Sequence, residues 1–221
     1  MELRDIGDLD FYTVEEYQQL SSVKRFFYRI YRSIPVLFLI VPVYYIFIHN
    51  RLPLIQLSAF KKERLPLMLS NLTVIIFYAL VGYWIGYKAF FLVQIPIWIF
   101  FGIIAIWFFY VQHQHEDTYK QWKDGWEYLL AAFKGSTFYD LPKWMHWLTG
   151  NIGYHHIHHL NSLIPNYNLA KCHEENPVFH PYVIKMGFRE SLKCAMNKLW
   201  DESTQRMITF KEYKNRFSKK G

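Results

Sequence analysis

Two long uncharged stretches constrain this chain more than any other feature of its sequence. Leu67–Tyr87 and Ala89–Val111 contain 21 and 23 residues, and neither holds an Asp, Glu, Lys or Arg. A helix rises about 1.5 Å per residue, so each stretch can cross a hydrocarbon layer of about 30 Å. Soluble helices keep a polar face and rarely stay apolar all round over this length. The two stretches therefore predict a transmembrane helical hairpin rather than a buried hairpin of a soluble fold.

A third apolar stretch, Ile34–Ile48, is too short to assign by length. Its 15 residues include Pro35 and Pro42, and as a helix they cover about 22 Å. It could cross the membrane, or it could be re-entrant or interfacial. Lys and Arg accumulate on the cytoplasmic side, and they are frequent in residues 1–66 and 112–221. We therefore expect those two regions on the cytoplasmic side, Lys88 at the far turn, and a re-entrant or interfacial Ile34–Ile48.

The charges divide the chain into three segments. Residues 1–32 hold 11 charged side chains, residues 33–111 hold 6, and residues 112–221 hold 26. We expect an all-α fold with a cytosolic helical segment (1–33), a membrane region (34–111) and a cytosolic cap with a C-terminal helix (112–221). Within the membrane region, 34–48 is re-entrant or short, and 67–87 and 89–111 span.

Local signals refine the two cytosolic segments. Thr13 and Glu16 fit a capping box, which predicts a helix running toward Arg32. Apolar residues at helical spacing predict one amphipathic helix over residues 188–217. The net charge of +7 is explained by basic cytoplasmic loops, so no nucleic-acid partner is expected. The two cysteines make no disulfide framework and favour a reducing compartment.

Six of the ten histidines fall in two clusters. His113 and His115 follow the last apolar stretch, and Gly153–Leu160 contains His155, His156, His158 and His159. In a helix, residues i, i+3 and i+4 share a face, so His155, His158 and His159 lie together. Neutral imidazole is a good ligand for iron or zinc, and this density predicts a metal site.

The other polar residues near these clusters are weaker candidates. His113 lies on the expected side of the membrane to join the second cluster, whereas His115 and His156 are secondary choices. Asn151, Glu174 and Glu175 are candidates to orient the ligands. The four remaining histidines are expected to be structural or solvated: His49, His146, His173 and His180. A histidine-rich, carboxylate-poor site at a membrane surface favours an oxidase or oxygenase acting on a lipid chain over a hydrolase.

These residues resemble a known family. The stretch Gly150–Leu160, followed by Ile164–Leu169 and Cys172–Pro177, is similar to the third histidine box of bacterial membrane fatty acid desaturases of the acyl-lipid omega-6 (delta-12) type. Phe109–His113 resembles the end of the last transmembrane helix in that family, and Val14–Tyr17 resembles a stretch soon after its second box.

The resemblance implies an oxygen-dependent enzyme that removes two hydrogens from an acyl chain at a di-iron site. Its electrons would come from a ferredoxin or cytochrome b5-type donor, and its histidine box would face the cytoplasm at the bacterial inner membrane. By the family pattern His155, His158 and His159 are iron ligands, and His113 is an additional one. The family also implies an even number of spans between its second and third boxes, which agrees with a re-entrant Ile34–Ile48.

The sequence departs from the family in its histidine count. The family has two earlier boxes, of His-x-x-x-His and His-x-x-His-His type, but only His49 precedes residue 113. One box and one extra histidine cannot fill two metal sites. We therefore expect the C-terminal part of a desaturase, inactive alone, from a truncated gene, a fragment or a split enzyme whose N-terminal partner supplies the missing histidines. The alternatives are an inactive metal-binding membrane fragment, or a hydroxylase or ketolase of the same histidine-rich membrane group.

Overall fold

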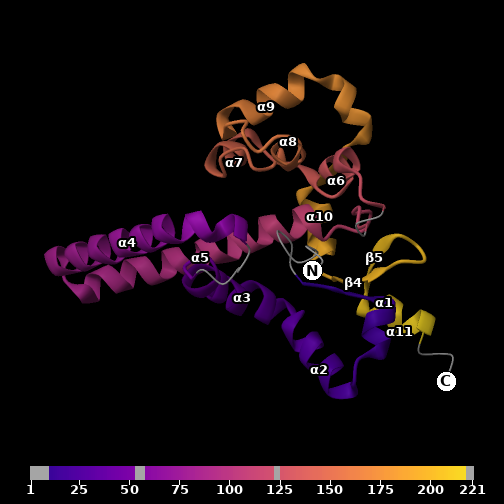
Figure 1. Ribbon diagram of the computed structural model, residues 1–221, viewed down its shortest axis with the longest axis horizontal. Coiled ribbons are helices and arrows are strands. Elements are labelled where there is room, and N and C mark those ends of the chain that lie inside the picture. Colours follow the sequence, from indigo (N-terminus) through magenta and orange to yellow (C-terminus); the bar gives the residue numbers. More distant parts are fainter. Residues whose placement is uncertain (1–9, 53–57, 122–124, 218–221) are drawn as a thin grey trace. The chain divides into compact units, whose positions relative to one another are not determined.

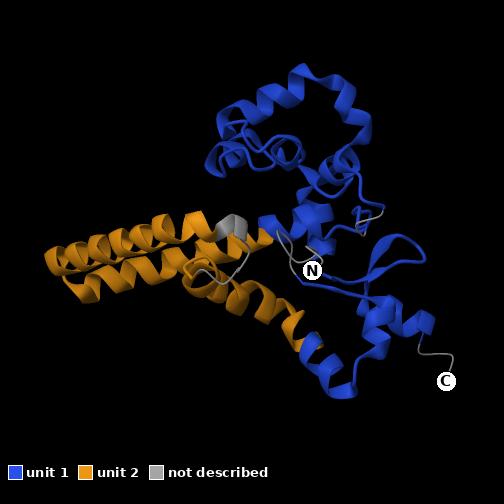
Figure 2. Cartoon of the chain, viewed as in Figure 1, with its two compact units in different colours: residues 1–28, 108–221 blue, residues 29–107 orange. Residues whose placement is uncertain are grey.

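The computed structural model describes residues 10–52, 58–121 and 125–217, and it is mostly helical (Figure 1). The predicted all-α class is confirmed in that sense, with two small sheets in addition. The chain forms two compact units (Figure 2). One combines residues 1–28 with 108–221, and the other contains residues 29–107.

The unit of residues 29–107 contains the predicted hairpin. Helix α4 (Arg64–Ile85) follows a 3-10 turn at Ser58–Glu63, and α5 (Tyr87–His113) begins after Gly86. Gly86 has a φ of 87°, a conformation that glycine adopts without steric cost. The two helices lie side by side, with the ring of Tyr78 5.4 Å from that of Phe90 (Figure 1). Both are long and apolar enough to cross a membrane, which indicates a membrane protein.

The third apolar stretch is helical and packs against α5. It consists of a π-helical turn (Val36–Ile40), α3 (Val41–Tyr44) and a second π-helical turn (Tyr45–His49). A Cβ at Gly102 of α5 would lie only 2.7 Å from the Cβ of Pro42, so the absence of a side chain permits this close approach. In the chain it follows helix α2 (Ser22–Tyr31) after a break, and the two together are a candidate for one broken span or a re-entrant loop.

The other unit joins the two ends of the chain through a three-stranded sheet. Strand β4 (Asn197–Asp201) pairs in parallel with β1 (Tyr12–Thr13) and antiparallel with β5 (Arg206–Thr209). Phe11, Trp200 and Met207 form a buried cluster on it. Helix α1 (Val14–Gln19) directly follows β1 in the chain, and α11 (Phe210–Phe217) directly follows β5.

Two of the predicted helices are shorter than the sequence suggests. The capping box of Thr13 and Glu16 is confirmed, but α1 ends at Gln19 because Leu20 is extended, and α2 starts anew at Ser22. The single helix predicted over residues 188–217 is wrong. Its ends are α10 (Phe188–Cys194) and α11, but its middle forms β4 and β5.

Strands β4 and β5 form instead of a helix because the burial of β4 and the tight turn after it outweigh the helical spacing of the apolar residues. Every residue of β4 is buried between its two neighbours. Asp201 then accepts hydrogen bonds from the backbone N–H and the hydroxyl of Ser203 and from the hydroxyl of Thr204. Such side-chain bonds offer the backbone an alternative to helix, and they close the turn to β5.

The histidine box lies in a cap of short elements. These are α6 (Tyr128–Lys134), β2 (Thr137–Asp140), α7 (Lys143–Leu148), α8 (His155–Leu160), α9 (Asn166–Glu175), a 3-10 turn (Pro177–Tyr182) and β3 (Ile184–Gly187). β2 and β3 pair in parallel. The carbonyl of Gly153 accepts a hydrogen bond from Tyr139 N–H at 2.8 Å, which ties the approach to α8 to β2.

Candidate metal centre

Three histidines from two helices converge on one point. His113 ends α5, and His155 and His159 lie one turn apart on α8. The Nε2 atom of His155 is 3.0 Å from that of His113 and 3.1 Å from that of His159. Ligand atoms of all three residues lie within 4.8 Å of one another, and in the described ranges this is the one such group of three His, Cys, Asp or Glu side chains.

A hydrogen bond to a backbone carbonyl orients the ring of His113. The Nδ1–H of His113 donates to the carbonyl of Gly135 at 3.3 Å, because a carbonyl only accepts. Nε2 of His113 therefore carries the lone pair that a metal needs. One residue earlier, the side-chain amide of Gln112 donates to the carbonyl of Ile152 at 2.7 Å and joins the end of α5 to the segment before α8.

The electrostatics of the cluster favour neutral imidazole. Burial lowers the pKa of His155 well below its usual range, and the neighbouring His113 and His159 lower it further. A neutral ring can bind a metal through its lone pair, whereas a protonated ring cannot. Nδ1 of His155 is buried and has no hydrogen-bond partner among the residues that the structure describes.

The donor set fits a first-row transition metal. A metal–imidazole bond is about 2.1 Å long, so two nitrogens on one ion lie at most about 4.2 Å apart, and the two Nε2–Nε2 distances in the cluster, 3.0 and 3.1 Å, are within that limit. Nitrogen ligands without carboxylates suit iron, zinc or copper better than magnesium or calcium. The cluster can therefore hold one such ion through His113, His155 and His159.

The sequence relationships agree with this chemistry. A model of the fatty acid desaturase family matches residues 4–189. The chain belongs to the fatty acid desaturase family.

Individual relatives extend this match. The chain is 39% identical over 215 residues to a fatty acid desaturase of Bacillus subtilis (strain 168), a match that covers 97% of this chain and 60% of the relative. It is 32% identical over 121 residues to an sn-1 oleoyl-lipid 12-desaturase of Picosynechococcus sp. (strain ATCC 27264 / PCC 7002 / PR-6), covering 51% of this chain and 33% of that protein. The chain thus spans about 60% of the length of the Bacillus desaturase, and less of the cyanobacterial one.

The other predicted histidines, His115, His156 and His158, are outside the group of three. The ring of His158 stacks on that of His155, with centroids 5.5 Å apart and planes 21° apart, but His158 is outside the group of three. His115 is buried two residues beyond α5 and is also outside that group. His156 is buried and its Nε2 is 2.9 Å from Nδ1 of His173 on α9.

This pair of His156 and His173 was not predicted. His173 is one of the histidines expected to be structural or solvated, and its ring also stacks on that of His180, with centroids 4.2 Å apart. Burial lowers the pKa of His156 to about 3, with a further contribution from His173. The two partners lie on different helices and 17 residues apart, so local spacing carries no signal of their contact.

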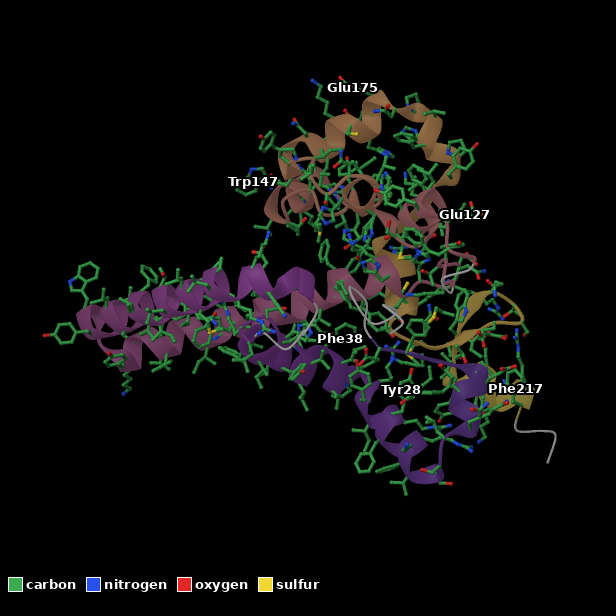
Figure 3. The ribbon with its side chains drawn as sticks, viewed as in Figure 1. Tyr28, Phe38, Glu127, Trp147, Glu175 and Phe217 are labelled. Carbon is green, nitrogen blue, oxygen red and sulfur yellow. The ribbon has the colours of Figure 1, made fainter. Side chains whose placement is uncertain are left out.

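The residues expected to orient the ligands make other contacts. The side-chain amide of Asn151 donates to the carbonyl of Asn166 at 3.0 Å. Glu175, at the outer side of α9 (Figure 3), forms an exposed ion pair with Lys171 at 3.8 Å. Glu174 raises the pKa of His173, although burial and His180 outweigh it. The carbonyl of Gly135 accepts from the candidate ligand His113, and a backbone atom leaves no residue-type signal in the sequence.

Proposed function

We propose that this chain serves in a fatty acid desaturase that introduces a double bond into a lipid acyl chain with molecular oxygen. Reduction of one O2 to two waters needs four electrons and four protons. Two hydrogen atoms from the acyl chain supply half of each, and two further electrons and two protons supply the rest. A ferredoxin or cytochrome b5-type donor would supply the two electrons. The observation that carries the proposal is the convergence of His113, His155 and His159 in a member of this family.

We assign the histidines to a di-iron site. His113, His155 and His159 would hold one iron, and His158, stacked on His155, is available to the second. Bound iron would supply the oxygen activation that removal of unactivated hydrogens requires. Neutral imidazoles bring no negative charge and so leave the metal electrophilic, and the carbonyl of Gly135 keeps His113 in the ligating tautomer. His115 and His156 remain secondary predictions.

We further propose that the site is completed by histidines from polypeptide outside these 221 residues. Two irons need more ligands than one group of three histidines and His158 provide. A ligand histidine normally donates its second ring N–H, so the buried Nδ1 of His155, without a partner in the described ranges, further indicates an acceptor that those ranges do not supply. The chain alone is then expected to be inactive.

The membrane arrangement follows from the sheet. β1 pairs with β4, and the hydroxyl of Tyr28 donates to the carbonyl of Lys198 at 2.6 Å. These contacts support our proposal that residues up to 28 and residues after 108 lie on one side of the membrane, with an even number of crossings between them. If α4 and α5 both cross, residues 36–49 do not. We propose the bacterial inner membrane, with the histidine cap on the cytoplasmic side.

Fatty acid analysis of a bacterial host tests this function. The host would express the chain alone, or joined to a segment that carries the two earlier histidine boxes of the family. We expect a new double bond only with the joined polypeptide, and its loss in His155→Ala. His49→Ala, which changes a histidine outside the cluster, is the matched control.

Two outcomes would contradict the proposal. A hydroxylated or ketonised product would move the enzyme to the related oxygenases. Two irons bound per isolated chain, measured by elemental analysis, would refute the need for outside ligands.

A further inference from the structure

Helix α2 carries its apolar face on the outside. Val23, Phe26, Phe27 and Ile30 are exposed by 63%, 60%, 62% and 42%. At 3.6 residues per turn these four side chains fall within an arc of about 100°. A surface helix of a soluble domain normally turns such a stripe toward its own core.

The side of α2 that packs on its own unit is a different one. Tyr28, labelled in Figure 3, is buried and lies about 150° around the helix from the centre of the apolar arc. Its hydroxyl donates to the carbonyl of Lys198 and accepts from Tyr12 N–H at 3.2 Å, and its ring packs against Phe210. These contacts fix the rotation of α2, so the apolar stripe does not face the core of this unit.

Basic residues border the stripe, and α2 contains no acidic residue. Lys24 lies about 110° from the centre of the stripe on one side, and Arg29 lies about 110° from it on the other; both are exposed. Arg25 lies further around the helix and donates hydrogen bonds to the carbonyls of Leu20 and Gln18. Long basic side chains at the borders of an apolar face can reach lipid head groups while the face enters the acyl region.

We propose that α2 lies flat in the membrane interface, with its apolar stripe among the acyl chains and Lys24 and Arg29 against anionic lipid head groups. The charge pattern complements an anionic surface, and the chain runs from α2 directly into the apolar helix Val36–His49 and on to two helices that can span. The three basic residues of α2 oppose a span through this segment. The inference does not depend on the metal centre.

Spin labels on single cysteines in the full chain test the depth of α2. The background is Cys172→Ser, and Cys194 is buried and therefore shielded from the label. Each of the four stripe residues is replaced in turn by a cysteine that carries the label. Ser22→Cys, exposed and outside the stripe, is the matched control on the same helix. In nanodiscs containing phosphatidylglycerol, we expect all four stripe labels at one shallow depth, accessible to oxygen, and the label at 22 accessible to an aqueous nickel reagent.

Other depth patterns would overturn the proposal. A depth that increases steadily from residue 23 to residue 30 would make α2 part of a span. Aqueous exposure of all four stripe labels, or their protection by contact with a second copy of the chain detected by spin–spin coupling, would assign the stripe to another role.

The charge component has its own test. Lys24→Gln is combined with the spin label at residue 27 in anionic nanodiscs. The ratio of lipid-inserted to water-exposed label should fall about fivefold, since one basic residue near an anionic surface contributes about that factor. In phosphatidylcholine nanodiscs the same substitution should have little effect, and Lys24→Arg should retain insertion. An equal effect in both lipids would refute the anionic head-group contact.

Discussion

The two cysteine thiols differ in environment, and this difference is measurable. Burial raises the pKa of Cys194 to about 12, whereas Cys172 is half-buried. Only the thiolate reacts with alkylating reagents, so near pH 8 the native chain should incorporate one maleimide, at Cys172. Mass spectrometry of labelled peptides measures this. Cys172→Ser should abolish labelling until the protein is unfolded, and equal labelling of both thiols would contradict the burial of Cys194.

Asp201 should make the chain sensitive to acid. Burial raises its pKa, but hydrogen bonds from Ser203 and Thr204 and the charge of Arg216 more than offset this, so the pKa is lowered overall. The carboxylate therefore stabilises the fold above its unfolded pKa of about 3.9, and this contribution disappears as the pH falls through the lower folded value. Asp201→Asn should cost about 1–3 kcal/mol at pH 7 and progressively less in acid.

Thermal unfolding of the detergent-solubilised chain at pH 7 and at successively lower pH measures the effect of Asp201→Asn. Glu175→Gln, which removes one partner of an exposed ion pair, is the control and should change little at either pH. A constant difference between wild type and Asp201→Asn across this range would contradict the ionised state of Asp201.

Among the structural elements, α8 depends on a glycine at its approach. A Cβ at Gly153 would lie 2.5 Å from Cε1 of His146 and 2.7 Å from the carbonyl oxygen of Tyr139. The backbone of β2 cannot yield as a side chain can, so Gly153→Ala should displace the segment that carries His155. We expect a loss of about 1–3 kcal/mol of stability and weaker binding of a divalent metal, measured by thermal unfolding and by calorimetric titration with Zn²⁺.

Gly125→Ala is the matched control for this glycine. Among the described residues, a Cβ there would meet the side-chain amide of Gln121, at 3.1 Å, and that group can move. It should leave both unfolding and metal binding near wild type. If Gly153→Ala behaved in the same way, the close packing of β2 against the approach to α8 would be refuted.

For the molecule in its membrane, the sheet predicts the topology. Residues on both sides of the hairpin meet in one unit through β1 and β4, so we expect them to share one side of the membrane. On a Cys172→Ser background, Glu175→Cys and Glu15→Cys should react with an impermeant reagent only after cells are permeabilised. Lys88→Cys, at the far turn of the hairpin, should react in intact spheroplasts. Opposite accessibility of residues 15 and 175 would contradict the parity of crossings.

Some features of the chain could be predicted from short-range pattern alone. The apolar stretches predict α4 and α5 because length and hydrophobicity are local properties. The spacing of His155 and His159 places them on one face of a helix for the same reason. Thr13 and Glu16 define the start of α1, since a capping box involves only neighbouring residues.

Other features depend on contacts between residues far apart in the chain. Residues 197–201 and 206–209 are strands because β4 pairs with both β1 and β5, although the spacing of apolar residues in this segment fits a helix. His113 meets His155 across 42 positions, and His156 meets His173 on another helix. The apolar stripe of α2 faces outward because Tyr28 binds Lys198. Helical periodicity shows which side chains share a face, but only long-range packing determines what that face meets.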